Sequence, residues 1–365
     1  MKEDTYPVPV SVQGAGSSSC WNWIPDQVGV FLVEHLTNIF ILCTQSYHAR
    51  IRKMKRFLER AIIHASNKNG CLYVLGDGRS GTTWLAQILN YNDQYVEFVE
   101  PYHGWGHLNL PDNRLYPTVG DIGRLGLDVN CWEQLSSQLP KSAGLTIKKR
   151  FPPPLAGVLV KDISAHLVLD LLNKNNARKL YIIRNPISVA MSKEKYGRWH
   201  APADISMLLQ ACGFNDNIGQ RCLSDGLVTS EFQEYIFVWC LLHRHALPVV
   251  VRSSEYFVLF YEDVLRNTEA SIAEIFRWIG EERQFEKYRS SILDCAGAKS
   301  RTVSGDCDFL SNRFLEQPWE GRKEAEAIEQ AHEIVRRFGL DSIYGETLEP
   351  KICSRCLKAV VNQWL

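Results

Sequence analysis

Glycine, hydroxyl and arginine residues gather at positions 76–84, in a pattern that suits the binding of a phosphate or another oxyanion. Gly76 and Gly81 have the G-x-x-x-x-G spacing of a loop that holds nucleotide phosphates. In triphosphate-binding proteins the residue after the second glycine is a lysine that reaches the β- and γ-phosphates, and here it is Thr82. The nearest cation is Arg79, inside the loop. The segment therefore predicts an oxyanion site that lacks the triphosphate lysine.

The flanking residues supply the elements that would hold this loop. Residues 71–75 form a short apolar run that is typical of a buried parallel strand. From Thr82 onward, the spacing of Leu85, Ile88 and Leu89 is helical. The free N–H groups of a first helical turn attract anions, and neighbouring hydroxyls add donors. A glycine-rich turn with no bound anion is the alternative interpretation, but the loop offers more donors than such a turn requires: Arg79, Ser80, Thr82 and Thr83.

A second anion site is predicted about a hundred residues later in the chain. Residues 179–183 read as a buried strand that ends at Arg184, and Asn185-Pro186 has the residue types of a helix cap and first helical position. Ser192 lies eight residues beyond Arg184, two turns into that helix, so both could reach one phosphate. Because ligands of open α/β sheets bind beyond the carboxyl ends of the strands, the two loops would lie together. Two such sites suit a nucleotide phosphorylated at both 5′ and 3′ positions.

These two segments resemble the cofactor motifs of sulfotransferases that use 3′-phosphoadenosine 5′-phosphosulfate (PAPS). The resemblance is carried by Gly-Arg-Ser-Gly-Thr-Thr-Trp-Leu (78–85) and by Ile-Arg-Asn-Pro (183–186) with Ser192. It implies that Arg184 and Ser192 hold the 3′-phosphate and that the first loop holds the 5′-phosphosulfate through Arg79, Ser80, Gly81, Thr82, Thr83 and Trp84. It also implies an α/β, three-layer P-loop-containing nucleotide-hydrolase-like fold, with a central, mostly parallel sheet and helices on both faces.

The likeness extends over residues 71–345 with falling specificity. Residues 257–265 resemble the late strand and Tyr-Glu-Asp turn of the family, and residues 338–344 resemble its closing segment. A late basic loop that closes over the cofactor would correspond to Lys299-Ser-Arg-Thr302, with Arg301 as a phosphate ligand; a solvated loop is the alternative. Trp84 would offer its ring to the adenine, or would instead be a core tryptophan at the start of the helix.

The position of the catalytic base differs between subfamilies. Phenol and steroid sulfotransferases carry a histidine two residues after a strand-end lysine, whereas residues 157–163 place Ile163 there, after Lys161. Carbohydrate and tyrosine sulfotransferases carry a glutamate, often as Glu-Pro, about twenty residues after the first loop. Glu100-Pro101 lies 21 residues beyond Arg79, so Glu100 is the predicted base, with a surface glutamate before a turn as the alternative. Reserve candidates are His103, His107 and His166.

In sulfuryl transfer, charge builds on the departing phosphate while the acceptor loses a proton. Arg79 and the loop amides would stabilise that charge, as in phosphoryl transfer. We expect burial among Phe98, Tyr102 and Trp105 to raise the pKa of Glu100 toward a value useful for a base. Lys161 would orient the sulfuryl group or the acceptor, or form a surface salt bridge. No metal is predicted, because the C-x-x-C at 353–356 stands alone.

Length, charge and cysteine count narrow the possible partners, compartment and domain organisation. The 365 residues are 45% apolar with a formal net charge of zero, which argues against nucleic acid as a partner. The 11 scattered cysteines favour a reducing, cytoplasmic setting. We predict a disordered start and helical extension at 1–70, a sulfotransferase domain at 71–345 and a C-terminal tail at 346–365. Residues 28–56 combine an apolar stripe with a basic run, which suits peripheral membrane contact or packing on the domain itself.

Three functions follow from this reading. The first is a PAPS-dependent sulfotransferase that acts on a hydroxyl of a small molecule, a sugar or a lipid and releases the bisphosphate 3′,5′-ADP (PAP). The second is a P-loop kinase or nucleotide-binding protein, disfavoured by the missing lysine after Gly81. The third is a catalytically silent member of the same fold. The acceptor and the oligomeric state do not follow from the sequence.

Overall fold

A computed structural model describes most of the chain beyond residue 69. The described residues belong to the second of two compact units, Glu59–Leu365, and the first unit, Met1–Leu58, lies outside them. The segment predicted to contact a membrane, 28–56, therefore also lies outside the described residues. The described ranges are 70–104, 108, 110, 114–127, 157–173, 177–197, 202–214, 218–298 and 319–364.

Five parallel strands form a sheet in the order β2-β3-β1-β4-β5. The first strand along the chain lies in the middle, and its two neighbours pair with it in register, Leu75 opposite Asp162 and Gly76 opposite Ile182. The carboxyl ends of these three strands consequently meet at one edge. The strands are β1 (Cys71–Gly76), β2 (Tyr95–Val99), β3 (Gly157–Asp162), β4 (Arg178–Ile183) and β5 (Tyr256–Phe260).

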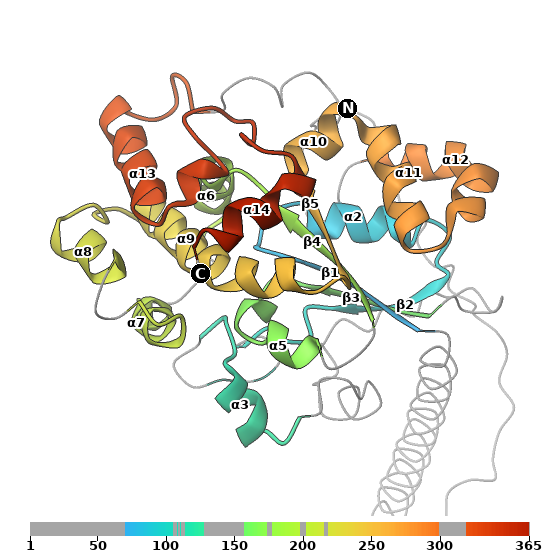
Figure 1. Ribbon diagram of the computed structural model, residues 1–365, viewed down its shortest axis with the longest axis horizontal. Helices are drawn as coiled ribbons and strands as arrows, with labels where there is room; N and C mark the ends of the chain where they lie inside the picture. The colour runs from blue at the N-terminus through green and yellow to red at the C-terminus, as the bar shows by residue number, and fades with distance from the viewer. Residues whose placement is uncertain are drawn as a thin grey trace, which may run out of the picture. The chain divides into compact units, whose positions relative to one another are not determined.

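Side chains that alternate between the two faces of the sheet form two separate cores. Leu72 and Val74 of β1 belong to one core, and Tyr73 and Leu75 belong to the other, as expected because successive strand residues point to opposite faces. Figure 1 shows α2, α11 and α12 on one side of the sheet and α5 and α9 on the other. The helices of the first core are α2 (Thr82–Leu89), α10 (Tyr261–Arg266), α11 (Thr268–Trp278) and α12 (Glu282–Gly297).

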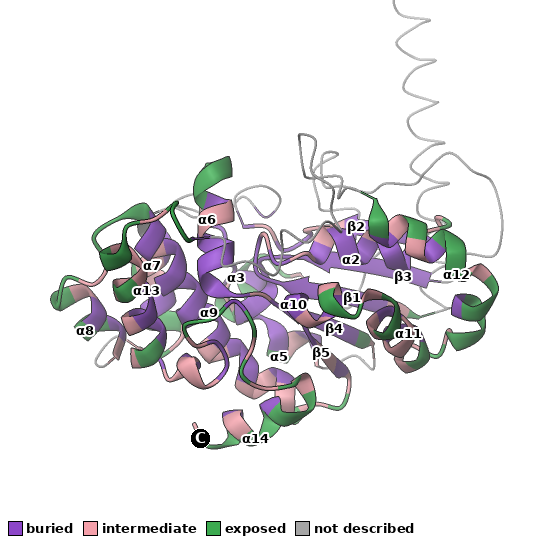
Figure 2. Cartoon of the chain, turned by 90° about the horizontal axis from the view of Figure 1, so that it is seen from above, coloured by how far each residue is buried: buried purple, intermediate pink, exposed green. Residues whose placement is uncertain are grey.

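The second core contains side chains from helices of very different length. They include α5 (Leu169–Leu172), α6 (Pro186–Tyr196), α9 (Glu231–Arg252), α13 (Ala325–Arg337) and α14 (Leu357–Asn362). In Figure 2 the strands are buried between helices whose outer faces are exposed. The predicted fold class, a three-layer α/β fold with a parallel central sheet of the P-loop type, is confirmed.

Further elements complete the described part of the chain. No strand was predicted between residues 201 and 233, and the described residues there form α7 (Pro202–Ala211), α8 (Ile218–Ser224) and the start of α9. Residues after 345 include α14, whose Leu357 and Val361 are buried against the core. The other elements are α3 (Val119–Arg124), η2 (Ala165–Leu167), η4 (Leu340–Ser342) and η5 (Ser354–Cys356).

Helix α9 is long and apolar enough to cross a membrane by length and composition alone. Most of its apolar stretch is buried within the fold, with Trp239, Leu241 and Leu242 fully enclosed in the second core. Burial within the protein therefore accounts for its composition.

Candidate active site

The two predicted anion-binding segments touch each other. The β1–α2 loop and the β4–α6 loop follow neighbouring strands and emerge at the same edge of the sheet. The guanidinium of Arg184 donates through Nη1 to the backbone oxygen of Arg79 at 2.8 Å. Arg79 in turn donates through Nε to Ser192 Oγ at 2.9 Å. Arg79 is thus joined to two residues that lie more than a hundred positions later in the chain, and the three side chains form one contiguous group with two cations.

This group holds two like charges close together. Burial and the neighbouring Arg184 both lower the pKa of Arg79, although an arginine stays protonated at neutral pH. Each guanidinium also lies over an aromatic ring, Arg79 at 4.4 Å from the Tyr196 centroid and Arg184 at 4.5 Å from that of Tyr261. Adjacent cations repel one another, and a multiply charged anion between them would relieve that repulsion.

The loop between β1 and α2 contains two glycines at positions where a Cβ would clash with neighbouring atoms. A Cβ on Gly76 would lie 2.4 Å from the Ile182 carbonyl oxygen, because β1 and β4 approach closely there. Gly81 has a φ of +95°, and a Cβ would lie 2.7 Å from the Tyr261 ring. Arg79 also adopts a left-handed backbone conformation, with a φ of 70°. Such conformations are costly for residues other than glycine and cluster at functional sites.

The remaining loop residues present donors at the start of α2. The Ser80 hydroxyl is buried and has no hydrogen-bond partner among the described residues. Thr82 is buried at the first position of the helix, and Thr83 is half-buried. With the free N–H groups of the first turn, these side chains form the kind of helix N-terminus that binds phosphate groups.

Trp84 lies in the core, which is one of the two alternatives that the sequence left open for it. Its side chain is buried, its Nε1 donates to the Ala296 oxygen at 2.9 Å, and its ring meets Tyr261 edge-on at 6.0 Å. The ring packs between α2 and α12 in the first core. The described contacts of Trp84 are therefore those of a core residue.

A buried ion pair that the sequence did not predict links the same two segments. Lys193 Nζ donates to both carboxylate oxygens of Asp77, at 2.7 and 2.9 Å, and both side chains are 1% exposed. Asp77 Oδ1 also accepts from the Gly78 N–H at 2.7 Å. Burial opposes ionisation of Asp77, but the Lys193 ammonium together with His166 and His243 lowers the carboxyl pKa. Lys193 is the neighbour of Ser192, so the pair fixes α6 against the phosphate loop.

The predicted base lies next to the strand-end lysine. Glu100 follows β2 with a φ of 55°, and its N–H donates to the Lys161 carbonyl oxygen at 2.6 Å. The Lys161 ammonium forms an ion pair with the Glu100 carboxylate, whose side chain is 22% exposed. The structure thus differs from the expected apolar surroundings of Glu100, because β2 pairs with β3 and brings an ammonium to the carboxylate. Phe98 and Tyr102 are buried in the core, and Trp105 lies outside the described residues.

A second carboxyl group supports this turn and was missed in the sequence. Asp162, at the end of β3, is fully buried and accepts from the Tyr102 N–H at 2.8 Å and from the Ser164 N–H at 2.6 Å. Burial, with a contribution from the nearby Glu100 carboxylate, raises the pKa of Asp162 to about 7. Its position next to Lys161 was visible in the sequence, but its amide partners belong to the turn after β2. Asp162 therefore holds the Glu100 turn against the end of β3.

Asp162→Asn is expected to loosen that turn. The asparagine side chain keeps one acceptor oxygen but turns an NH₂ group toward a backbone N–H, which leaves a buried amide without its partner. Such a loss costs about 1–3 kcal/mol of folding free energy. Denaturant unfolding of the variant and of the wild-type protein measures the difference. Amide hydrogen exchange at Tyr102 and Ser164 separates this loss from the cost of burying the wild-type carboxylate charge, and unchanged protection of both amides would contradict the role given to Asp162.

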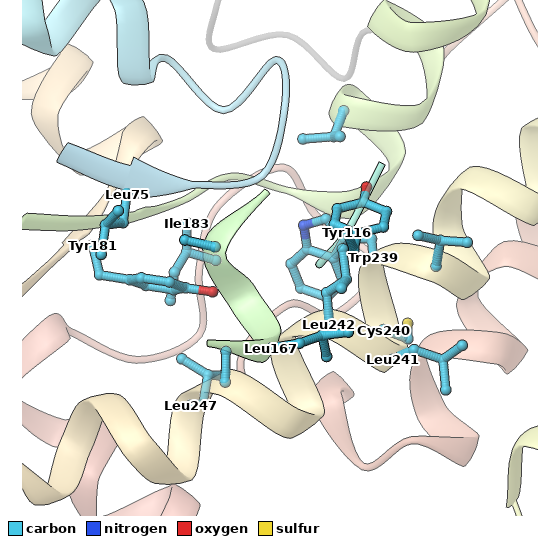
Figure 3. Close-up of a cluster of buried hydrophobic side chains, with 14 of the residues drawn as sticks. Leu75, Tyr116, Leu167, Tyr181, Ile183, Trp239, Cys240, Leu241, Leu242 and Leu247 are labelled. Carbon is cyan, nitrogen blue, oxygen red and sulfur yellow. The ribbon is translucent and has the colours of Figure 1, made fainter. Parts of the chain in front are cut away.

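His166, a reserve candidate for the base, lies in the core instead. Its ring centroid is 5.7 Å from that of His243, 6.0 Å from Tyr181 and 6.1 Å from Tyr116. Burial lowers the pKa of His166 to about 3 and that of His243 to about 4. Both His166 nitrogens lack a hydrogen-bond partner among the described residues. Figure 3 shows Tyr116 and Tyr181 of this cluster among apolar side chains.

These buried histidines predict that acid destabilises the fold. An unfolded histidine binds a proton near its ordinary pKa of about 6.5, whereas the folded pair, near Asp77, Lys193 and His245, does so only at about 3 and 4. Their stabilising contribution is present above pH 6.5 and is lost as the pH falls below it. Asp162 acts in the opposite sense, since its folded pKa lies above its unfolded one.

His166→Phe separates these effects. Unfolding of the variant should take up one proton fewer than unfolding of the wild type between pH 6.5 and 5. The slope of the unfolding free energy against pH should therefore fall by about 1.4 kcal/mol per pH unit. Unfolding free energies measured across that range for both proteins provide the comparison. Parallel curves for the variant and the wild type would show that His166 is not held neutral in the fold.

Several predicted residues lie outside the described part of the chain. They are Arg301 with its neighbour Lys299, and the reserve candidate His107. His103 is described, and its N–H donates to the Glu100 carbonyl oxygen at 3.0 Å. Within the described ranges, no group of three or more His, Cys, Asp or Glu side chains is arranged to hold a metal ion.

Comparisons with solved structures find sulfotransferases of low similarity. They include the sulfotransferase domain of the Synechococcus PCC 7002 olefin synthase (15% identity, covering 74% of this chain and 94% of that chain, TM-score 0.38). Mouse sulfotransferase SULT7A1 complexed with PAP has 12% identity and a TM-score of 0.37, and the match covers 83% of this chain and 93% of that chain. The sulfotransferase domain from the curacin biosynthetic pathway has 13% identity, 81% and 96% coverage and a TM-score of 0.38. At such values the fold assignment rests on the strand order instead.

The family comparison is more direct. A comparison with curated proteins finds no match. The model of the sulfotransferase domain family matches residues 72–301, which is more than half of the chain and includes both anion-binding segments. This protein therefore belongs to the sulfotransferase domain family.

Proposed function

We propose that this protein transfers a sulfuryl group from PAPS to a hydroxyl group of a small-molecule, sugar or lipid acceptor. One observation carries the proposal within the family: Arg79, Ser192 and Arg184 join two anion-binding segments at neighbouring strand ends. A nucleotide with phosphates at both its 5′ and 3′ positions has the charge to engage both segments. The proposal also accounts for the absence of the lysine that triphosphate binders carry after Gly81.

The two ends of the donor are assigned to different segments. The 5′-phosphosulfate is assigned to Arg79, to the Ser80, Thr82 and Thr83 hydroxyls and to the free N–H groups that begin at Gly81. The 3′-phosphate is assigned to Arg184 and Ser192. Contact between Arg79 and Ser192 supports a single donor molecule that engages both segments, because the two segments meet at this point. The buried Trp84 is not included among these ligands, and Arg301 stays a prediction of the sequence.

In the proposed reaction, the acceptor oxygen attacks sulfur while the bond between sulfur and the phosphate oxygen breaks. The acceptor proton passes to Glu100, and 3′,5′-ADP leaves with the negative charge of the former bridging oxygen. Arg79 stabilises that charge, and cations fixed in place before the reaction are effective in this role. Lys161 holds the Glu100 carboxylate through their ion pair and supplies a positive charge near the carboxyl end of β3, one of the two neighbours of β1.

Incubation with PAPS and a panel of hydroxyl acceptors tests the activity. The expected result is an acceptor whose mass increases by one sulfuryl group, together with equimolar 3′,5′-ADP. Phosphate transfer from ATP to the same panel would instead support the kinase alternative. Binding of 3′,5′-ADP without turnover on sugars, lipids or small alcohols and phenols would favour the catalytically silent alternative.

Ser192→Ala is expected to weaken binding of the 3′-phosphate selectively. A hydrogen bond to a charged group contributes about 1.5–3 kcal/mol, so affinity for 3′,5′-ADP should fall by roughly 10–100-fold. Affinity for 5′-AMP, which lacks the 3′-phosphate, should change little. Isothermal titration calorimetry with both nucleotides provides the measurement. An equal loss for both nucleotides would contradict the assignment of Ser192 to the 3′-phosphate.

A further inference from the structure

Two cysteines near the carboxyl end form a feature that the proposed transfer reaction does not use. Cys353 and Cys356 are both exposed; Cys353 comes directly before the single turn η5, and Cys356 is its last residue. Their sulfur atoms lie 2.9 Å apart. The Cys356 N–H donates to the Cys353 carbonyl oxygen at 2.9 Å, which closes the turn and keeps the side chains adjacent. The folded chain therefore presents two thiols that face each other and the solvent.

The two thiols have different acidities. Hydrogen bonds from the Cys356 thiol and from nearby backbone N–H groups lower the pKa of Cys353, and the same contact raises that of Cys356. Burial has the opposite effect on other described cysteines, raising the pKa of Cys212 to about 12 and that of Cys222 to about 11. Because the thiolate is the reactive form, accessible Cys353 is favoured over these buried thiols.

We propose that Cys353 and Cys356 are a redox-active dithiol that exchanges with low-molecular-weight disulfides. The Cys353 thiolate attacks one sulfur of the small disulfide, forms a mixed disulfide and releases a thiolate. Cys356 then loses its proton and attacks the Cys353 sulfur, which closes the intramolecular disulfide and releases the second small thiol. The two protein thiols are oxidised, and the small disulfide is reduced to two thiols.

The residues on either side of Cys353 and Cys356 are held in place by contacts with the rest of the protein, so structural change on oxidation should be confined to the turn between the two cysteines. After the pair, Leu357 and Val361 of α14 are buried in the second core. Before it, the Thr347 and Leu348 oxygens accept from Asn185 Nδ2 at 3.1 and 3.3 Å. Ring closure needs no displacement of either neighbour, because the sulfur atoms are already adjacent. Oxidation is therefore expected to leave the fold intact.

Equilibration with oxidised and reduced glutathione tests the proposal. The full chain should lose the mass of two hydrogen atoms as the buffer becomes more oxidising, and peptide mapping should place the disulfide between Cys353 and Cys356. Cys295→Ser, which changes a half-buried cysteine elsewhere, serves as the matched control and should behave like the wild type.

Single variants test the order of the steps. Cys356→Ser should accumulate a mixed disulfide with glutathione at Cys353, because the resolving thiol is gone. Cys353→Ser should react several-fold more slowly at Cys356. Circular dichroism spectra of both variants should match that of the wild type, because both positions are exposed. The proposal is overturned if the wild type forms no 353–356 disulfide, if glutathione modifies other cysteines first, or if the two variants react at equal rates.

Discussion

Glu100→Gln is expected to lower turnover by about 10²–10⁴-fold, the usual contribution of a general base. Glutamine has the same shape and can still accept a hydrogen bond from Lys161, so the turn after β2 should persist. The variant cannot take the acceptor proton. Steady-state turnover on the identified acceptor, together with calorimetric affinity for 3′,5′-ADP, measures both consequences. Affinity should stay at the wild-type value, because Glu100 is not assigned to the nucleotide.

Glu255→Gln is the matched control for this prediction. Glu255 also pairs with a buried lysine, Lys179, at 2.7 Å. That pair lies at the amino ends of β4 and β5, at the edge of the sheet opposite the site. Turnover of the control should equal that of the wild type. A Glu100→Gln variant that retains wild-type turnover would rule out Glu100 as the base, and a comparable loss in the control would indicate a general effect of breaking ion pairs.

Lys193→Met is expected to destabilise the fold by about 3–5 kcal/mol, because it leaves the Asp77 carboxylate buried without its partner. Both side chains are almost completely enclosed, so water cannot replace the lost ammonium. The same change should weaken 3′,5′-ADP binding, since the ion pair fixes the phosphate loop against α6. Denaturant unfolding and calorimetry measure the two effects. Lys195→Met, on the exposed side of the same helix, should change stability by no more than about 0.5 kcal/mol.

The double variant Asp77→Asn, Lys193→Met separates the cost of an unpaired buried charge from the loss of the contact between the loop and α6. Removing the carboxylate charge as well should recover much of the lost stability, because no unpaired ion is then buried. Nucleotide affinity should remain low, because the contact between loop and helix is still missing. Recovery of affinity along with stability would contradict the positioning role of the pair. A stable Lys193→Met variant would show that the ion pair contributes little.

Local signals in the sequence predicted the elements that carry the site. The apolar run before Gly76 became β1, and Asn185 caps α6 by accepting from the Ile187 and Ser188 N–H groups. These patterns are readable because a strand or a helix cap depends on residues close together in the chain. The edge at which Arg79 and Arg184 meet followed from the general rule for parallel sheets.

Contacts between distant segments could not be predicted in the same way. Asp77 and Lys193 are 116 positions apart, and neither the glycine loop nor the helix pattern indicates their pairing. The surroundings of Glu100 depend on the register between β2 and β3, which aligns Val99 with Lys161. Spacing along one chain does not determine that register. Glu100 therefore forms an ion pair with Lys161, where the sequence had predicted apolar surroundings.

The side-chain environment of Trp84 shows a third limit. A tryptophan at the first turn of a helix can face a ligand or the core, and the choice depends on what packs above it. Here α12 supplies the Ala296 oxygen to its indole N–H. That partner lies 212 positions away, so the sequence left both orientations open.

One nucleotide with phosphates at both ends is proposed to bridge the Arg79 loop and the Arg184–Ser192 group. Titration calorimetry of the full chain with 3′,5′-ADP and, separately, with ATP tests it most directly. We expect tight binding of 3′,5′-ADP, with one molecule per chain, and much weaker binding of ATP. Preference for ATP, or no binding of 3′,5′-ADP to a folded sample, would contradict it.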